Sequence, residues 1–358
     1  MLKKVAKTST TTGANNMARK YLEDMLKEVT VRDIEKVHLP SAYALLQEEG
    51  RKAGLKPTSE VSMLGSSIKI DKPYPGIEKV VGKGMYLMPA GKGGCADACK
   101  DKTAGCAAAC LHNSGFQSLA HQTARTNALR RDPAYGLAIV THELHTHAEN
   151  VLRQGGLPSG RLDATGELHI EDIPEVGDYV WGGPGGKYQK IHKTGPYKGL
   201  PHLIGSEYGK RYAKEPLGKP TPAPGQPNVY RAPSWSERLT RGRALELIGE
   251  GHDIALPVTN IRKKDNPTHI SMQFGTGEEP LVLPVSDFDV HDSTFLRNRF
   301  KPAGEPGHAG ILREKRPGFD KKRPSGSEQA AARFLRAHPV ETPVSVSRRP
   351  SRKQNSRD

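Results

Sequence analysis

Long hydrophobic runs are missing from this 358-residue sequence. No stretch of about eighteen apolar residues occurs, which predicts a chain without a transmembrane helix and without a membrane partner. The first residues include lysines but no apolar core of the secretory kind, so we expect a cytoplasmic protein. Hydrophobic residues make up only 35%, beside 38 glycines and 28 prolines. That composition excludes a coiled coil, a membrane bundle and one tight domain that uses every residue.

Familiar catalytic and phosphate-binding motifs are missing as well. The sequence has no G-x-S-x-G, no Walker loop, and no G-x-G-x-x-G between a strand and a helix. The glycines at 182–186 are interrupted by a proline, so they are unsuited to cradle a phosphate. No internal repeat is present. The function must therefore be sought in local clusters of polar residues.

Positive charge is in excess, with a formal net charge of +15. Residues 313–358 hold 13 basic and 5 acidic side chains, so +8 of that excess lies in the tail. A basic, Ser- and Pro-rich tail predicts disorder and binding to DNA or RNA. Tyrosines alternate with lysines over 187–219, which is typical of single-stranded nucleic-acid contacts, although a flexible basic loop fits equally well. Nothing in the sequence indicates a protein partner.

Hydrophobic spacing predicts strands alternating with helices, hence an α/β body that we expect to be barrel-like. Helices are expected at Met17–Val29, Leu39–Ala53, Ser114–Arg131, Ala134–Gln154 and from the capping box at Ser234–Glu237. Strands are expected at Met85–Met88, Arg161–Ile170, Leu203–Tyr208, Asp253–Val258 and Leu281–Val285. The expected organisation is a disordered leader (1–16), a helical segment (17–84), the α/β body (85–312) with a Gly/Pro-rich basic insertion (182–228), and a mostly disordered tail (313–358).

All four cysteines lie within residues 95–110, spaced C-x3-C-x6-C-x3-C: Cys95, Cys99, Cys106 and Cys110. In a reducing cytosol such clustering favours metal over disulfides. Four thiolates suit tetrahedral zinc or an iron–sulfur cluster. The spacing matches neither the paired C-x2-C of structural zinc sites nor the C-x3-C-x2-C of radical S-adenosylmethionine enzymes. We expect a Cys-rich metal-binding insertion, with iron–sulfur and zinc both open and unmetallated thiols or a disulfide as the alternative.

Five short motifs in order resemble the phage "gene product 88" family of actinobacteriophages and some bacteria. They are Leu87–Gly91 with the cysteines that follow, Arg161–Glu167, Tyr208–Lys210, Ser234–Glu237, and Asp289–Asp292 with Phe295-Leu296. Cys99 is extra to the family pattern, and Asp163 and Glu167 stand where Asn and Asp are commoner. The resemblance implies an α/β, barrel-like body and a thiolate metal site. It implies no particular activity.

The motifs supply the candidate site residues. Asp163 and Glu167 have an even separation on an expected strand, so both carboxylates would point to one side as an acid/base pair; a polar outward face is the alternative. Asp289 and His291 follow an expected buried strand, and an Asp–His pair can orient an imidazole; loop-capping hydrogen bonds are the alternative. The catalytic candidates are Asp163, Glu167, Lys210, Asp289 and His291. The substrate-binding candidates are Arg161, Tyr208, Ser234, Glu237 and Asp292.

A histidine-rich segment, His142–His147, lacks the second histidine of a zinc HExxH motif because Thr146 stands there. His142 and His145 share a helix face that points away from the apolar stripe, so a solvated surface is favoured over a ligand role. Two functions stay open. One is a metal-binding enzyme acting on nucleic acid or nucleobases; the other is a non-enzymatic DNA- or RNA-binding accessory protein, for phage replication or host takeover, with a structural metal. A phage origin would place either in the host cytoplasm.

Overall fold

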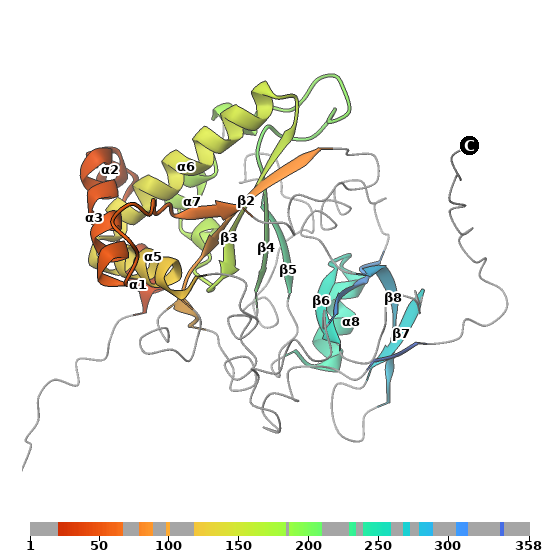
Figure 1. The fold of residues 1–358 in the computed structure, drawn as a ribbon. Helices are drawn as coiled ribbons and strands as arrows, with labels where there is room; N and C mark the ends of the chain where they lie inside the picture. Colours follow the sequence, from red (N-terminus) through yellow and green to blue (C-terminus); the bar gives the residue numbers. More distant parts are fainter. Residues whose placement is uncertain are drawn as a thin grey trace, which may run out of the picture.

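A computed structural model of the chain describes residues 21–66, 79–88, 98–100, 118–183, 186–209, 229–233, 239–258, 268–272, 279–288, 306–313 and 337–339. The described residues form two five-stranded sheets, with most of the helices beside the first (Figure 1).

The first sheet contains β1 (Leu64–Ser66), β2 (Val80–Tyr86), β3 (Leu157–Thr165), β4 (Ile204–Gly209) and β5 (Val229–Pro233) in that order. β1 is antiparallel to β2, and the remaining neighbours are all parallel. Every residue of β3 except the last is buried, as expected of a central parallel strand covered on both faces. Because β2 to β5 run in one direction, their carboxyl ends meet at the same edge of the sheet.

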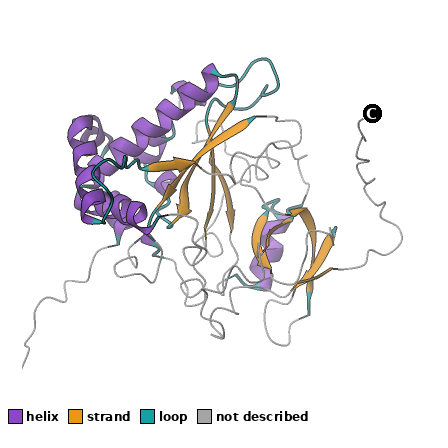
Figure 2. Ribbon diagram, viewed as in Figure 1, coloured by secondary structure: helices purple, strands orange, loops and turns teal. Residues whose placement is uncertain are grey.

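The helices of the first part are α1 (Leu22–Leu26), α2 (Val31–Glu35), α3 (Leu39–Lys52), α5 (Leu119–Arg131), α6 (Pro133–Arg153) and α7 (Val176–Val180), with short 3-10 turns at η3 (Ile170–Asp172) and η4 (Lys187–Gln189). The longest, α6, begins at an Asp132 cap that accepts the N–H of Tyr135. It contacts β1, β2 and β3, while α2, α3, α5 and α7 contact α6. Figure 2 shows these helices gathered beside the sheet.

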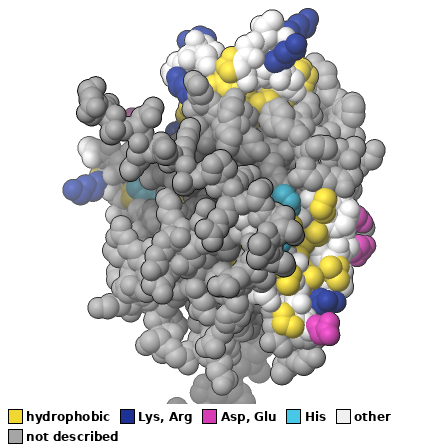
Figure 3. Space-filling model, turned by 90° about the vertical axis from the view of Figure 1, so that its right-hand side faces the viewer, with side chains coloured by type: hydrophobic (Ala, Val, Ile, Leu, Met, Phe, Trp, Pro, Cys, Tyr) yellow, Lys and Arg dark blue, Asp and Glu magenta, His cyan; other side chains and the backbone are white. Residues whose placement is uncertain are grey.

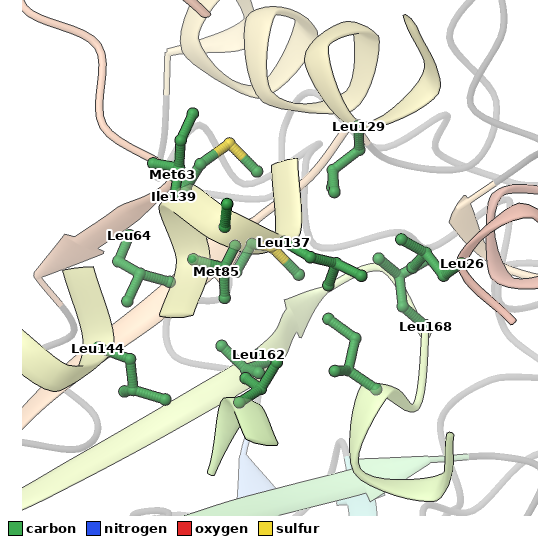
Figure 4. Packing of buried hydrophobic residues seen from close by; sticks show 14 of the residues in the cluster. Leu26, Met63, Leu64, Met85, Leu129, Leu137, Ile139, Leu144, Leu162 and Leu168 are labelled. Carbon is green, nitrogen blue, oxygen red and sulfur yellow. The ribbon is translucent and has the colours of Figure 1, made fainter. Parts of the chain in front are cut away.

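Leucines and methionines from the helices and strands form one hydrophobic core (Figure 4). Leu137 and Leu144 of α6 face Met85 of β2 and Leu162 of β3, and all four are fully buried. The core also takes in α1 to α3, so the N-terminal helical segment belongs to the same body as the sheet.

The second sheet has the order β10-β7-β8-β9-β6, from β6 (Ile254–Val258), β7 (His269–Met272), β8 (Leu281–Phe288), β9 (Ala309–Arg313) and β10 (Ala337–Pro339). β6, β9 and β8 are parallel, and α8 (Arg241–Gly249) contacts β6. Leu245 and Val282 of this part are exposed, and Figure 3 shows hydrophobic side chains reaching the surface beside acidic and basic ones.

The structure confirms the α/β class and most expected helices and strands. The expected barrel-like body is wrong for the described residues. Both described sheets are open, because each has two end strands that lack a second neighbour in their sheet. The expected strand Arg161–Ile170 ends at Thr165, where Gly166 turns the chain at a φ of 99°. The helix expected from Ser234 begins only at Arg241, capped by Thr240.

The expected helix Met17–Val29 is short in the described part of the chain, at Leu22–Leu26. One strand, β10, falls within the tail that the composition predicted to be mostly disordered. The leader (1–16) lies outside the described residues. Among the described helices, none is both long enough and apolar enough to cross a membrane.

Candidate functional site

The backbone ladder of β3 is interrupted near its carboxyl end. Its pairing with β4 stops after Gly160, which lies opposite Gly205. Its pairing with β2 is irregular between Gly84 and Tyr86. Bulges of this kind are common beside active sites, because they re-aim side chains. The interruption leaves backbone N–H groups of β3 that need other partners.

Carboxylates supply those partners. Glu207 reaches across from β4 and accepts the N–H groups of Leu162 and Asp163, the second at 2.9 Å. Asp163 in turn accepts the N–H groups of Leu168 at 2.8 Å and His169 at 3.1 Å. The two side chains therefore hold the end of β3 and the turn that follows it in one conformation.

The turn carries two further ionisable side chains. His169 adopts a left-handed backbone conformation, with φ 50° and ψ 48°, which is uncommon for a residue other than glycine. Its Nδ1 lies 3.4 Å from Asp163 Oδ2 and 3.6 Å from Glu171 Oε1. Donor atoms of these three residues all lie within 4.8 Å of one another, and all three residues are buried.

Glu167 is also buried, at 5% exposure, and the segment with Cys99 lies directly beside it. The N–H of Glu167 donates to Ala98 O at 2.7 Å, and Cys99 and Glu167 form an isolated parallel bridge. The side chain of Cys99 is itself buried. We refer to Asp163, Glu167, His169, Glu171 and Glu207 as the carboxylate–histidine cluster.

The electrostatics of the cluster are strongly perturbed. Burial raises the pKa of Asp163 to about 7, although His169 opposes the rise. Burial, followed by the charges on Asp163 and Glu171, raises the pKa of Glu207 well above its ordinary value, and buried Arg161 partly opposes that rise. Burial alone would lower the pKa of His169, but the charges on Asp163 and Glu171 outweigh it and raise this pKa to about 9. An acid with a pKa near 7 can both give and take a proton at neutral pH.

The structure brings some of the predicted site residues together. Asp163, Glu167 and Arg161 are all buried at this end of β3, so the outward polar face is wrong. Glu167 does not share the strand with Asp163, because the strand ends before it. Tyr208 lies on β4, and only its backbone is described. The remaining predicted residues lie outside the described residues: Cys95, Cys106, Cys110, Lys210, Ser234, Glu237, Asp289, His291 and Asp292.

The histidines of α6 have structural contacts. His142 is exposed, as expected. His145 is not solvated: it donates to Val180 O at 3.0 Å and its ring lies 4.6 Å from that of Tyr188. His147 is buried and donates to Val81 O at 3.0 Å. His145 and His147 thus hold α6 against α7 and β2.

Two tyrosines of the basic segment 187–219 are likewise buried. The hydroxyl of Tyr188 donates to Glu149 at 3.0 Å, and that of Tyr197 donates to Lys79 O at 3.0 Å. Their exposed fractions are only 4% and 6%, so neither ring offers a stacking surface for a base.

Three members of the cluster were missed by sequence reasoning: His169, Glu171 and Glu207. A signal was present for Glu207, which is a charged residue inside an expected strand. His169 and Glu171 follow a strand end, yet they gave no short-range pattern. Comparisons of the chain with protein-family models, with curated proteins and with solved structures found no match. The resemblance to the gene product 88 family therefore stays a prediction.

Proposed function

We propose that the chain is an enzyme acting on nucleic acid or nucleobases, with the carboxylate–histidine cluster as its reaction centre. One observation carries the proposal: five buried ionisable side chains converge beside the carboxyl end of β3, beyond the residues that pair with β4. Crevices at the carboxyl ends of parallel strands are the usual ligand sites of open α/β sheets. The net charge of +15 favours a polyanionic substrate over a neutral one.

Within the cluster the roles divide by contact. Asp163 and Glu207 each accept two backbone N–H groups, so they position the site. Glu167 is the group that we assign to substrate contact and proton transfer, and His169 and Glu171 complete the charged lining of the site. Asp163 also lies beside the imidazole of His169, where it would hold the ring in one orientation.

A thiolate metal centre belongs to the proposal as well. Cys95, Cys99, Cys106 and Cys110 would hold an iron–sulfur cluster or zinc. The bridge between Cys99 and Glu167 supports a position for this centre next to the reaction site. Iron would offer redox or Lewis-acid chemistry, whereas zinc would offer Lewis-acid chemistry or a structural bond only. Elemental analysis of anaerobically purified protein should find one of the two metals in near-stoichiometric amount, and finding neither would remove this centre.

The enzyme assay is a screen of substrate classes. The purified protein is incubated with single- and double-stranded DNA, RNA, nucleosides and free bases, and mass spectrometry records any change in mass. We expect one substrate class to react with the native protein and not with Glu167→Gln or His169→Gln. His142→Gln, on the exposed face of α6, is the matched control and should react normally. Absence of any product, or full activity in both cluster variants, would overturn the proposal.

The second candidate is a nucleic-acid-binding accessory protein of phage replication or host takeover with a structural metal. The four backbone N–H bonds accepted by Asp163 and Glu207 favour it, because a purely structural cluster would make such bonds too. It predicts salt-dependent binding to DNA or RNA without any product. A phage origin and a place in the host cytoplasm are common to both candidates.

A further inference from the structure

We propose that Asp163, His169 and Glu171 form a site for one divalent first-row metal ion, separate from the cysteines. The three residues belong to the carboxylate–histidine cluster, so a catalytic role for the metal rests on the proposed function. Metal binding, however, is measured on the free protein, so either claim can fail without the other.

The distances between the donor atoms are close to those between two ligands of one metal ion. His169 Nδ1 lies 3.4 Å from Asp163 Oδ2 and 3.6 Å from Glu171 Oε1. Nitrogen-to-oxygen hydrogen bonds are about 2.7–3.2 Å long. Ligand atoms at about 2.1 Å from one metal ion are separated by about 3.0 Å in octahedral geometry and about 3.4 Å in tetrahedral geometry. The two distances from the imidazole nitrogen to the carboxylate oxygens are therefore close to the distance between neighbouring ligands of one metal ion.

The burial of the three side chains adds a second reason. Their exposed fractions are 1%, 1% and 0%, so bulk water does not screen them. Within the cluster four carboxyl groups face one imidazole and the nearby guanidinium of Arg161. In the metal-free protein, protons retained by the buried groups limit the negative charge. A divalent cation would displace such protons and supply the compensating charge at the point where the donors converge.

The residues around the triad hold the donors in place. Asp163 accepts the N–H groups of Leu168 and His169, which fixes its carboxylate and leaves lone pairs for a metal. The left-handed backbone of His169 sets the direction in which its ring leaves the turn, and the ring lies beside Asp163 of β3. Such outer contacts commonly orient metal ligands.

The donor set selects the metal. Two carboxylate oxygens and one imidazole nitrogen suit Mn²⁺, Fe²⁺ or Zn²⁺, whereas Mg²⁺ and Ca²⁺ prefer oxygen alone and soft ions prefer thiolates. Mn²⁺ is therefore the best probe, because it enters an oxygen–nitrogen site but competes poorly for the four cysteines.

The test is a titration of the full-length protein with Mn²⁺, in which electron paramagnetic resonance counts the free ion. We expect about one tightly bound ion per chain. Glu171→Gln and His169→Gln should each weaken binding about 100-fold or more, since even outer-shell partners typically contribute about 10–100-fold. His147→Gln removes a different buried histidine, one that bonds to the backbone of β2, and should bind normally. Melting curves confirm that all variants are folded.

Unchanged Mn²⁺ affinity in both triad variants, or no binding by the native protein, would overturn the site. Binding of Mn²⁺ without any product in the substrate panel would leave the site standing and remove the enzyme. If the native protein forms a product that His169→Gln does not form, and neither protein binds Mn²⁺, the enzyme stands and the metal site is removed.

Discussion

Raising the pH should destabilise the metal-free protein, in contrast to proteins whose carboxylates are paired. The pKa of Asp163 rises from 3.8 in the unfolded chain to about 7 in the fold, mainly because the group is buried. Between these values the folded state keeps a proton that the unfolded state has released, so stability falls as the pH rises. At about 1.4 kcal/mol per pH unit, the gap of roughly three units costs about 4 kcal/mol by neutral pH.

His169 extends the effect to higher pH. Its pKa rises from 6.5 to about 9 despite its burial, because Asp163 and Glu171 are negatively charged. Its stabilising contribution is complete below pH 6.5 and disappears as the pH rises through 9, at a further cost of about 3 kcal/mol.

Urea unfolding between pH 5 and 9, with a chelator present throughout, measures this dependence. We expect the midpoint to fall steadily over the whole range. Asp163→Asn should make the urea midpoint less dependent on pH below pH 7, and His169→Gln should make it less dependent on pH above pH 7. A midpoint that is level or rises between pH 5 and 8 would refute the burial argument.

Three further predictions concern the frame around the site. Gly205→Ala should cost about 1–3 kcal/mol in a melting experiment, because its new methyl group would lie 2.7 Å from the ring of Trp181, whereas Gly242→Ala has open space and should cost nothing. Glu143→Ala should lower the unfolding free energy by about 2 kcal/mol or more, since it leaves two N–H groups at the start of β1 without their acceptors; an unchanged melting temperature would contradict this role. Deleting residues 341–358 removes five basic residues but keeps β10. For every phosphate that the tail neutralises, the deletion should reduce the log–log salt slope of nucleic-acid binding by roughly 0.7–0.9, and an unchanged slope would show that the tail binds no phosphate.

Regular elements were predictable wherever the local pattern was strong. The helix expected at Ala134–Gln154 is α6 (Pro133–Arg153), and the strand expected at Leu203–Tyr208 is β4 (Ile204–Gly209). In the second half of α6 the buried residues Leu144, His147, Ala148 and Val151 recur at helical spacing, as an amphipathic helix requires. The strand expected at Arg161–Ile170 was too long, because alternation continues past Gly166 although that glycine ends the strand.

The site was only partly predictable, because its contacts are long-range. Asp163 and Glu167 were found from their spacing, yet a central partner is distant along the chain: Glu207 is 44 residues from Asp163. Glu207 makes that contact because the hydrogen-bond ladder between β3 and β4 is interrupted, and no short sequence motif predicts such an interruption. His169 was missed because its importance comes from the turn that follows β3.

The most direct measurement is an anomalous diffraction map from crystals of the full-length protein soaked in Mn²⁺. We expect a peak between the side chains of Asp163, His169 and Glu171, with ligand bonds of about 2.1–2.2 Å. A map with no peak at the cluster, although Mn²⁺ sites appear elsewhere in the crystal, would contradict it.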